Sequence, residues 1–166
     1  MTPVRFLDRT SPPHVATLVL LAGLSTLAMN IFLPSLPGMA RWFEVDYAVM
    51  QLSVSSYLAG SAVLQIIVGP LSDRFGRRPV ILVALALFVL ATLIALFAPT
   101  AQWFLAARVM QAVVATGMAL SRAVIRDMVP AEQAASMIGY VTMAMSVVPM
   151  IGPAVGGALE VAWLGV

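Results

Sequence analysis

The chain has 166 residues, of which 61% are hydrophobic and only 10% are charged, and its mean hydropathy is +1.01. Soluble domains carry about 25% charged residues, so this composition excludes an ordinary globular enzyme or nucleic-acid-binding module. Nine arginines against seven acidic residues leave a net charge of only +2, too little for a phosphate-binding surface on so apolar a chain. The composition indicates an integral membrane protein.

The residue types that most enzymatic sites need are absent or isolated. The sequence has no cysteine, which excludes disulfides, thiolate metal sites and cysteine nucleophiles. Its single histidine, His14, precedes the first apolar segment and has no second histidine for a zinc site or a catalytic triad. Since no nucleophile, acid pair or metal-binding cluster is present, we expect no enzymatic activity, no cofactor, no metal and no nucleic-acid partner.

Five apolar segments are long enough to cross a bilayer, because a spanning helix needs about 20 apolar residues. Continuous apolar runs without polar alternation argue against membrane strands. The first segment follows Arg5 and Arg9 as a signal peptide would, but it is too long and four more follow, so we interpret it as an uncleaved helix. The predicted fold is all-α, a polytopic helical membrane protein with a tail at 1–14 and a partial helical bundle at 15–166. Its spans are expected at residues 15–35, 49–71, 80–98, 103–125 and 137–160.

The arginines predict how these helices are oriented, because positive charge is retained on the cytoplasmic side. Seven arginines fall in the tail and in the loops after the second and fourth spans, whereas the loop after the first span has only Arg41. We therefore expect a cytoplasmic amino terminus, with Glu44 and Asp46 on the outer side. The seven are Arg5, Arg9, Arg74, Arg77, Arg78, Arg122 and Arg126.

The first span ends with the sequence N-I-F-L-P-S-L-P at residues 30–37. The amide of Asn30 can hydrogen-bond a ligand, but it cannot take up and release a proton at physiological pH. No Asp or Glu lies deep in any predicted span, and Glu160 near the outer end of the fifth span is the nearest.

The loop between the second and third spans has the sequence G-P-L-S-D-R-F-G-R-R-P at residues 69–79. A turn that obeys the positive-inside rule explains its three arginines, but it does not explain Asp73. Gly69 permits close approach of a neighbouring helix, and Gly76 supplies turn conformations that other residues resist. Asp73 can cap a helix start or face a helix dipole, and Arg77 can bridge to a carboxylate on the next helix. Charged groups arranged in this way can hold two parts of a helical bundle together in one conformation and release them in another.

The fourth span carries Arg108, which costs several kcal/mol in mid-membrane unless it is paired or hydrated. Gln111 shares its helical face, which favours a polar site that faces the bundle. In the alternative interpretation, Arg108 extends past Trp103 to the outer interface. The span ends at Asp127, which we expect beside Arg77.

The fifth span contains the sequence P-M-I-G-P-A-V-G-G at residues 149–157. Its prolines remove backbone donors and bend the helix, and Gly152, Gly156 and Gly157 permit close helix contact. Packing of small residues alone is the alternative explanation for this stretch.

These stretches together resemble the major facilitator superfamily. Residues 69–78 match its loop signature G-x-L-x-D-R-x-G-R-[RK], and residues 108–112 are similar to its fourth-helix motif R-x-x-Q-G, with Ala112 where glycine is usual. The motif G-P-x-x-G-G at residues 152–157 resembles the fifth-helix signature of the antiporter branch. Residues 30–37 resemble the pattern D-M-Y-L-P-A-L-P of the multidrug and bicyclomycin/chloramphenicol-resistance group, with Asn30 in place of the acid and Phe32 in place of tyrosine.

The resemblance implies a drug:proton antiporter of the bacterial inner membrane that exports small amphipathic compounds. In that family the loop is understood to control gating, the fourth-helix arginine is linked to proton transfer, and the fifth-helix motif seals the central path. The resemblance thus implies gating residues, a proton and substrate pathway at Asn30, Arg108 and Gln111, and a substrate wall that includes Met29, Met110 and Met118. The implied gating residues are Gly69, Asp73, Arg74, Gly76, Arg77, Arg78 and Asp127.

Family members have twelve spans, with the substrate at the midplane between two six-helix halves. We therefore expect this chain to be the amino-terminal part of an exporter that pairs with missing carboxy-terminal helices. The alternative is a truncated, non-transporting membrane protein that associates with itself or with a full-length transporter. The coding sequence beyond Val166 distinguishes these two hypotheses, whereas the drug, the coupling ion and the oligomeric state stay open.

Overall fold

The computed structural model describes residues 14–164, and the predicted tail lies outside this range except for His14. The side chain of Glu160 also lies outside the described part. The described residues form helices and no strand, and five of their helical segments are long and apolar enough to cross a membrane, which confirms the all-α prediction. The elements are α1 (Val15–Asn30), η1 (Leu33–Ser35), α2 (Leu36–Trp42), α3 (Tyr47–Phe75), α4 (Arg77–Leu96), α5 (Ala101–Gln111), η2 (Ala112–Ala115), α6 (Thr116–Met128) and α7 (Ala131–Leu164).

The first span is not the continuous helix over residues 15–35 that we expected. It breaks at Ile31 and Phe32 and resumes as η1 and α2, which extends to Trp42. The reason is Pro34, which has no N–H to donate to the carbonyl of Asn30 and whose ring clashes with that carbonyl in a helix. Because hydropathy alone defined the predicted span, it missed this break.

The second and third spans are longer than predicted, and the loop between them shrinks to one residue. Helix α3 continues to Phe75 and α4 begins at Arg77, so Gly76 alone forms the junction. Gly76 has φ 89° and ψ 151°, a backbone conformation that is essentially restricted to glycine. At the other end of α3, Asp46 caps the helix by accepting a hydrogen bond from the Ala48 N–H at 2.8 Å.

We predict that Gly76→Ala destabilises the protein by about 1–3 kcal/mol, because alanine is strained at this backbone conformation. Gly69→Ala is the matched control in α3, since a Cβ at Gly69 meets no described atom within 4 Å. Thermal unfolding in detergent micelles checks the pair. Equal unfolding temperatures for the two variants would contradict the strain at Gly76.

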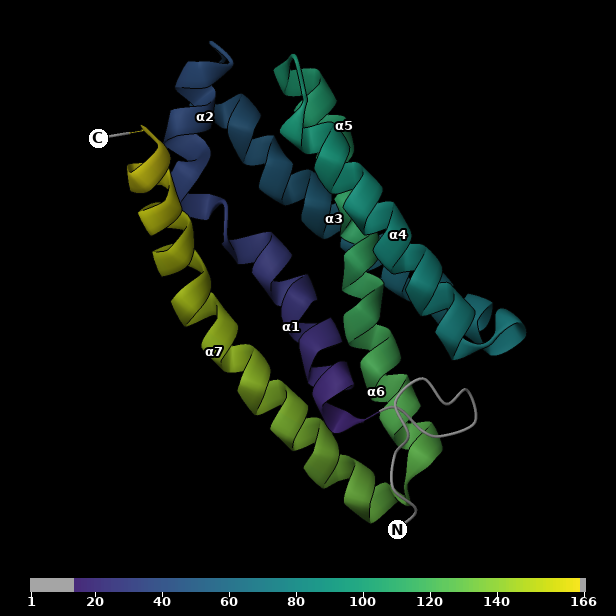
Figure 1. The fold of residues 1–166 in the computed structure, drawn as a ribbon. Coiled ribbons are helices and arrows are strands. Elements are labelled where there is room, and N and C mark those ends of the chain that lie inside the picture. The colour runs from purple at the N-terminus through teal and green to yellow at the C-terminus, as the bar shows by residue number, and fades with distance from the viewer. Residues whose placement is uncertain (1–13, 165–166) are drawn as a thin grey trace.

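The fourth and fifth spans also extend past their predicted ends. The fourth runs from α5 to α6 and tightens to a 3-10 turn at η2, directly after Gln111. The fifth, α7, begins at Ala131 and passes through Pro149 and Pro153 as one helix whose course bends beside α1 (Figure 1).

The helices pack so that α1 lies beside α7 and α6, while α5 lies between α3 and α4. The start of α1, the α3–α4 junction and the α6–α7 junction lie toward one end of the bundle, and α2 and the α4–α5 connection lie toward the other (Figure 1). The described arginines of the second and fourth loops therefore lie toward the first end, which we call the arginine-rich end.

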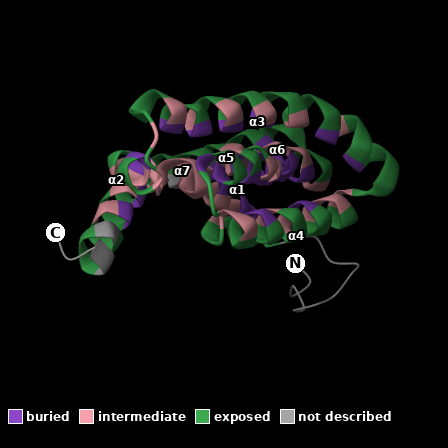
Figure 2. Cartoon of the chain, turned by 90° about the horizontal axis from the view of Figure 1, so that it is seen from above, coloured by how far each residue is buried: buried purple, intermediate pink, exposed green. Residues whose placement is uncertain are grey.

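The distribution of polarity is reversed relative to that of a soluble protein. Large apolar side chains such as Ile66 and Phe97 are 76% and 77% exposed, and the exposed surface follows the outer sides of α3 and α4 (Figure 2). Polar groups are buried instead, among them Ser25, Arg108 and Gln111. Apolar surface of this extent suits contact with lipid.

Candidate functional site

Arg108 lies in the interior of the bundle and is only 4% exposed. Its Nη1 donates to the Gln111 Oε1 at 2.7 Å and to the carbonyl of Ala28 at 3.2 Å. The Ala28 carbonyl belongs to the last turn of α1, where the negative end of the helix dipole favours a cation. The alternative in which Arg108 extends to the outer interface is therefore wrong.

Two aromatic rings complete the surroundings of Arg108. The guanidinium carbon lies 3.8 Å from the ring centre of Phe32 and 4.8 Å from that of Tyr57, within the range of cation–π attraction. Phe32 sits in the break after α1, so the broken helix places its ring against the cation. The sequence indicated Phe32 only as a replacement for tyrosine in a motif. Tyr57 was not predicted as a site residue, although it is a polar aromatic residue in the middle of a span.

Hydrogen bonds connect the site, and the residues beside it, to the neighbouring helices. Gln111 donates from Nε2 to the Thr92 Oγ1 of α4 at 3.0 Å. The Tyr57 hydroxyl of α3 donates to the Ser25 carbonyl of α1 at 3.2 Å, and the Ser25 hydroxyl donates to the Val114 carbonyl of η2 at 2.6 Å. The side chains that form these hydrogen bonds come from α1, α3, α4 and α5, so four helices hold the site in place.

Asn30 is oriented differently from these groups. Its Nδ2 donates to the Thr26 carbonyl of its own helix at 2.7 Å, and its Cβ lies against Gly152 of α7. Among the described residues, no hydrogen bond joins Asn30 to Arg108 or Gln111. The structure thus brings Arg108 and Gln111 together and places Asn30 at the α1–α7 interface.

The glycines of α7 pack along the end of α1. A Cβ at Gly152 would lie 3.5 Å from Asn30 Cβ, and one at Gly157 would lie 3.9 Å from Pro34 Cβ. At Gly156 it would overlap the Ile31 carbonyl oxygen, which belongs to the backbone at the break. Only glycine permits this approach of α7 to the break. Pro153, between these glycines, is half-buried.

At the arginine-rich end, Arg77 contacts three other side chains in what we call the Arg77 cluster: Ser72, Asp73, Arg77 and Asp127. Arg77 Nη2 lies 2.7 Å from the Asp73 Oδ1, and its Nε lies 3.0 Å from the Asp127 Oδ2. Nη1 donates to the Ser72 hydroxyl. The cluster links the α3–α4 junction to the end of α6, and it includes the expected contact between Arg77 and Asp127.

Other expectations for this loop are corrected. Asp73 lies in the last turn of α3 and caps no helix start, because α4 follows immediately after Gly76. Gly69 is in open space among the described residues, so no helix approaches it closely. Arg74 lies over the ring of the neighbouring Phe75, 5.5 Å from its centre, and Arg78 is exposed.

The comparisons with known proteins agree with these motifs. The family model described as Major Facilitator Superfamily matches residues 18–165. The chain belongs to the Major Facilitator Superfamily. This membership confirms the resemblance inferred from the motifs, and it agrees with the five helical segments that can span a membrane.

Several curated superfamily relatives are named for drug resistance. Multidrug resistance protein D of Escherichia coli (strain K12) is 35% identical over 88% of this chain and 37% of its own length. The chloramphenicol resistance protein of Pseudomonas aeruginosa is 33% identical over 90% of this chain and 37% of its own length. Multidrug resistance protein MdtM of Salmonella typhimurium is 34% identical over 80% of this chain and 32% of its own length. The chain thus spans about a third of the length of these relatives.

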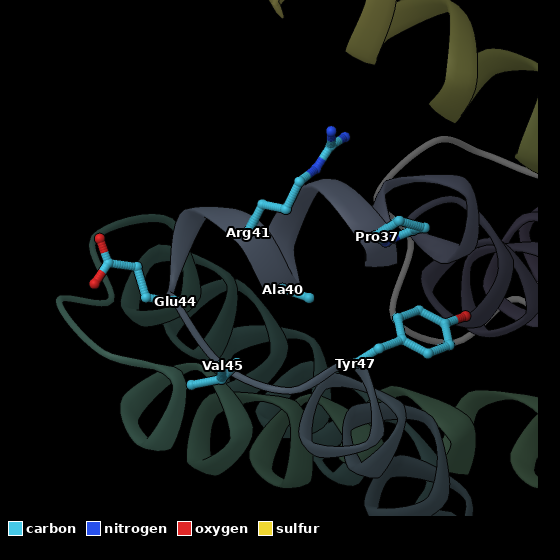
Figure 3. A pocket seen from close by; sticks show the side chains of 6 residues that line it. All are labelled: Pro37, Ala40, Arg41, Glu44, Val45 and Tyr47. Carbon is cyan, nitrogen blue, oxygen red and sulfur yellow. The ribbon is translucent and has the colours of Figure 1, made fainter.

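A hollow lies at the corner between α2 and α3. Its charged side chains, Arg41 and Glu44, point outward in different directions (Figure 3). None of its lining residues takes part in the Arg108 network, so we do not assign it to the candidate site. It is lined by Pro37, Ala40, Arg41, Glu44, Val45 and Tyr47.

Proposed function

We propose that the chain forms the amino-terminal part of a proton-driven antiporter that exports small amphipathic compounds. The observation that carries this proposal is the buried cation at Arg108, held with Gln111 among helices whose outer faces are apolar. Maintaining such a group inside a membrane protein is costly, and intramembrane charges of this kind mark substrate and ion pathways. The names of the drug-resistance relatives support drugs as the class of compound.

In this proposal Arg108 and Gln111 present polar groups to the substrate, and Met29, Met110 and Met118, all half-buried, supply adaptable apolar contacts. Asn30 contributes an amide beside the break in α1. The glycines of α7 hold that helix against the break and close the path to leakage.

We assign gating to the Arg77 cluster, at the end of the protein that we expect to move. Its acids are largely exposed, since the side chains of Asp73 and Asp127 are 64% and 56% accessible. Exposed ion pairs contribute only about 0.2–1 kcal/mol each, so they can break and re-form in every transport cycle. The cluster therefore suits a contact that closes one conformation without trapping it. Arg74 and Arg78 flank it and add positive charge at the same end.

Orientation and partners follow from the same proposal. The arginine-rich end, with the amino terminus, faces the cytoplasm of a cell whose inner membrane holds the protein. Carboxy-terminal helices of the complete transporter cover the substrate site. No described carboxylate lies deep in a span and Asn30 does not titrate, so we place the proton-binding group outside the described residues.

The test uses the complete reading frame that contains this chain, purified and reconstituted into proteoliposomes. With the lumen more acidic than the outside, an antiporter exchanges protons for substrate and concentrates it inside. We expect chloramphenicol to accumulate in the lumen and a protonophore to abolish the accumulation. A reading frame that stops at Val166, or vesicles that accumulate no chloramphenicol, ethidium or other amphipathic probe, would favour the non-transporting alternative.

For the Arg77 cluster we predict that Asp127→Asn lowers the transport rate severalfold while changing the free energy of unfolding by less than about 1 kcal/mol. The amide keeps the size of the side chain but removes the charge that holds Arg77 to α6. Glu132→Gln is the control, because Glu132 is an exposed acid at the same end, in the first turn of α7. Equal transport rates for both variants would show that the charge of Asp127 has no role in gating.

A further inference from the structure

One edge of the Arg108 guanidinium has no hydrogen-bond partner. Nη1 makes both of the hydrogen bonds described above, whereas Nε and Nη2 are fully buried and donate to no described acceptor. In arginine, Nε and Nη2 lie on the same side of the planar guanidinium, and their N–H bonds are parallel. This is the edge that binds both oxygens of a carboxylate at once.

The described carboxylates are engaged elsewhere or lie at helix ends. Asp73 and Asp127 pair with Arg77. Glu44, Asp46 and Glu132 lie between helices or in first turns, and no described carboxylate comes within 4 Å of Arg108. At position 30 the drug-resistance group that this chain resembles has an acid. This chain has Asn30 there, and its amide donates a hydrogen bond to the Thr26 carbonyl of its own helix.

The groups around Arg108 solvate its charge without cancelling it. The Ala28 carbonyl, the Gln111 oxygen and the two aromatic rings are all neutral. A buried charge is expensive unless it is both paired and hydrogen-bonded, and arginine does not release its proton to avoid this cost. The site therefore lacks an anionic group that has two acceptor atoms, one for Nε and one for Nη2.

We propose that a carboxylate of the transported compound supplies this charge by docking side-on against Nε and Nη2 of Arg108. The inference rests on the proposed function and makes it more specific, since it assigns amphipathic organic acids as the preferred substrates. The ring of Phe32 lies over the face of the guanidinium from the non-helical break after α1, and the ring of Tyr57 lies nearby, so both can contact the apolar body of such an acid.

The test compares three probes that share one apolar body and differ in charge: 4-butylbenzoate, 4-butylbenzamide and 4-butylbenzylammonium. Their binding to the complete transporter in nanodiscs is measured by calorimetry at pH 7. A charge-assisted bidentate pair should make benzoate bind about tenfold or more tightly than the benzamide, and the ammonium compound most weakly. Equal binding of the acid and the amide, or preference for the ammonium, would overturn the proposal. That result is also expected if another helix of the transporter neutralises Arg108.

Gln111→Glu provides the decisive variant. It places a carboxylate at the atom that already accepts from Arg108, so the chain itself neutralises the cation and the preference for benzoate should disappear. Gln102→Glu is the matched control, because it adds the same charge at an exposed position of the same helix and should leave the preference unchanged. If the Gln111→Glu variant still prefers benzoate, the carboxylate of the probe does not bind at Arg108.

Binding and transport are separate measurements, so the two proposals fail separately. Proton-driven accumulation of chloramphenicol without any preference for benzoate refutes the acid site and leaves the exporter intact. Preference for benzoate without proton-driven accumulation of any probe supports the site and refutes the exporter.

Discussion

Gly156→Ala is expected to destabilise the protein by about 3 kcal/mol or more, at the upper end of the cost of overpacking. The added methyl carbon would overlap the Ile31 carbonyl oxygen, which no relaxed structure permits. The obstructing atom is backbone, so no rotation of a side chain relieves the contact. Helix α7 must then move away from the break in α1, and transport should fall together with stability.

Gly139→Ala is the matched control for this prediction. It makes the same change in the same helix, but its Cβ meets no described atom within 4 Å. Alanine favours a helix over glycine by up to about 1 kcal/mol, so this variant should be as stable as the native protein or slightly more stable. Thermal unfolding in micelles compares the two. If both variants unfold at the same temperature, the contact between α7 and α1 is not as tight as described.

The α7 glycines have two explanations, packing of small residues and sealing of the central path. Packing of small residues accounts for Gly152 and Gly157, where a methyl group would make ordinary contacts at 3.5 Å and 3.9 Å. Gly156 differs because it contacts a backbone carbonyl at a discontinuity of the chain. Movement at the break in α1 would therefore displace α7 as well, so we expect a change at Gly156 to affect transport in the proposed exporter.

Hydropathy predicted the number and order of the membrane helices, because each is a long apolar run separated by polar residues. It did not predict where they break. The break after Asn30 had a visible signal in Pro34, since a proline cannot donate to the carbonyl four residues earlier. The 3-10 turn at η2 had none. There the helix packs against α3 so closely that a Cβ at Gly60 would lie 3.1 Å from Ala112 Cβ, and such tertiary contact is absent from any local pattern.

The candidate site was predictable to a similar extent. Arg77 and Asp127 carry opposite charges next to the ends of spans on the same side, so topology alone suggested their contact. The rings of Phe32 and Tyr57 were not predictable as partners of Arg108. Their contact depends on how α1, α3 and α5 are rotated about their axes, and helices that are apolar on nearly every face give little indication of that rotation.

Arg108→Lys is expected to reduce export about tenfold or more, although it preserves the charge. Arg108 uses one nitrogen to hydrogen-bond both the Ala28 carbonyl and Gln111, which leaves Nε and Nη2 free to bind another group. Lysine has a single nitrogen on a flexible side chain, so it cannot make these two hydrogen bonds and also bind a carboxylate side-on. Hydrogen bonds to charged groups contribute about 1.5–3 kcal/mol each, so the loss of one such bond alone accounts for a tenfold effect. Arg108→Ala should reduce export further, because it leaves the Gln111 oxygen and the Ala28 carbonyl without their donor.

The control for this prediction is Arg122→Lys, the same substitution at an exposed arginine of α6, which should export at the native rate. The comparison separates two roles that the sequence alone allowed. An arginine that only needs to place a positive charge at the membrane surface is replaced by lysine without loss, since both side chains extend to the headgroups. If Arg108→Lys exports at the native rate, only the charge of Arg108 is required and the planar shape of the guanidinium is not. That result would also contradict the proposed side-on binding of a carboxylate. A loss confined to Arg108 would mean that the planar guanidinium, rather than the charge alone, is required at the point where α1 breaks.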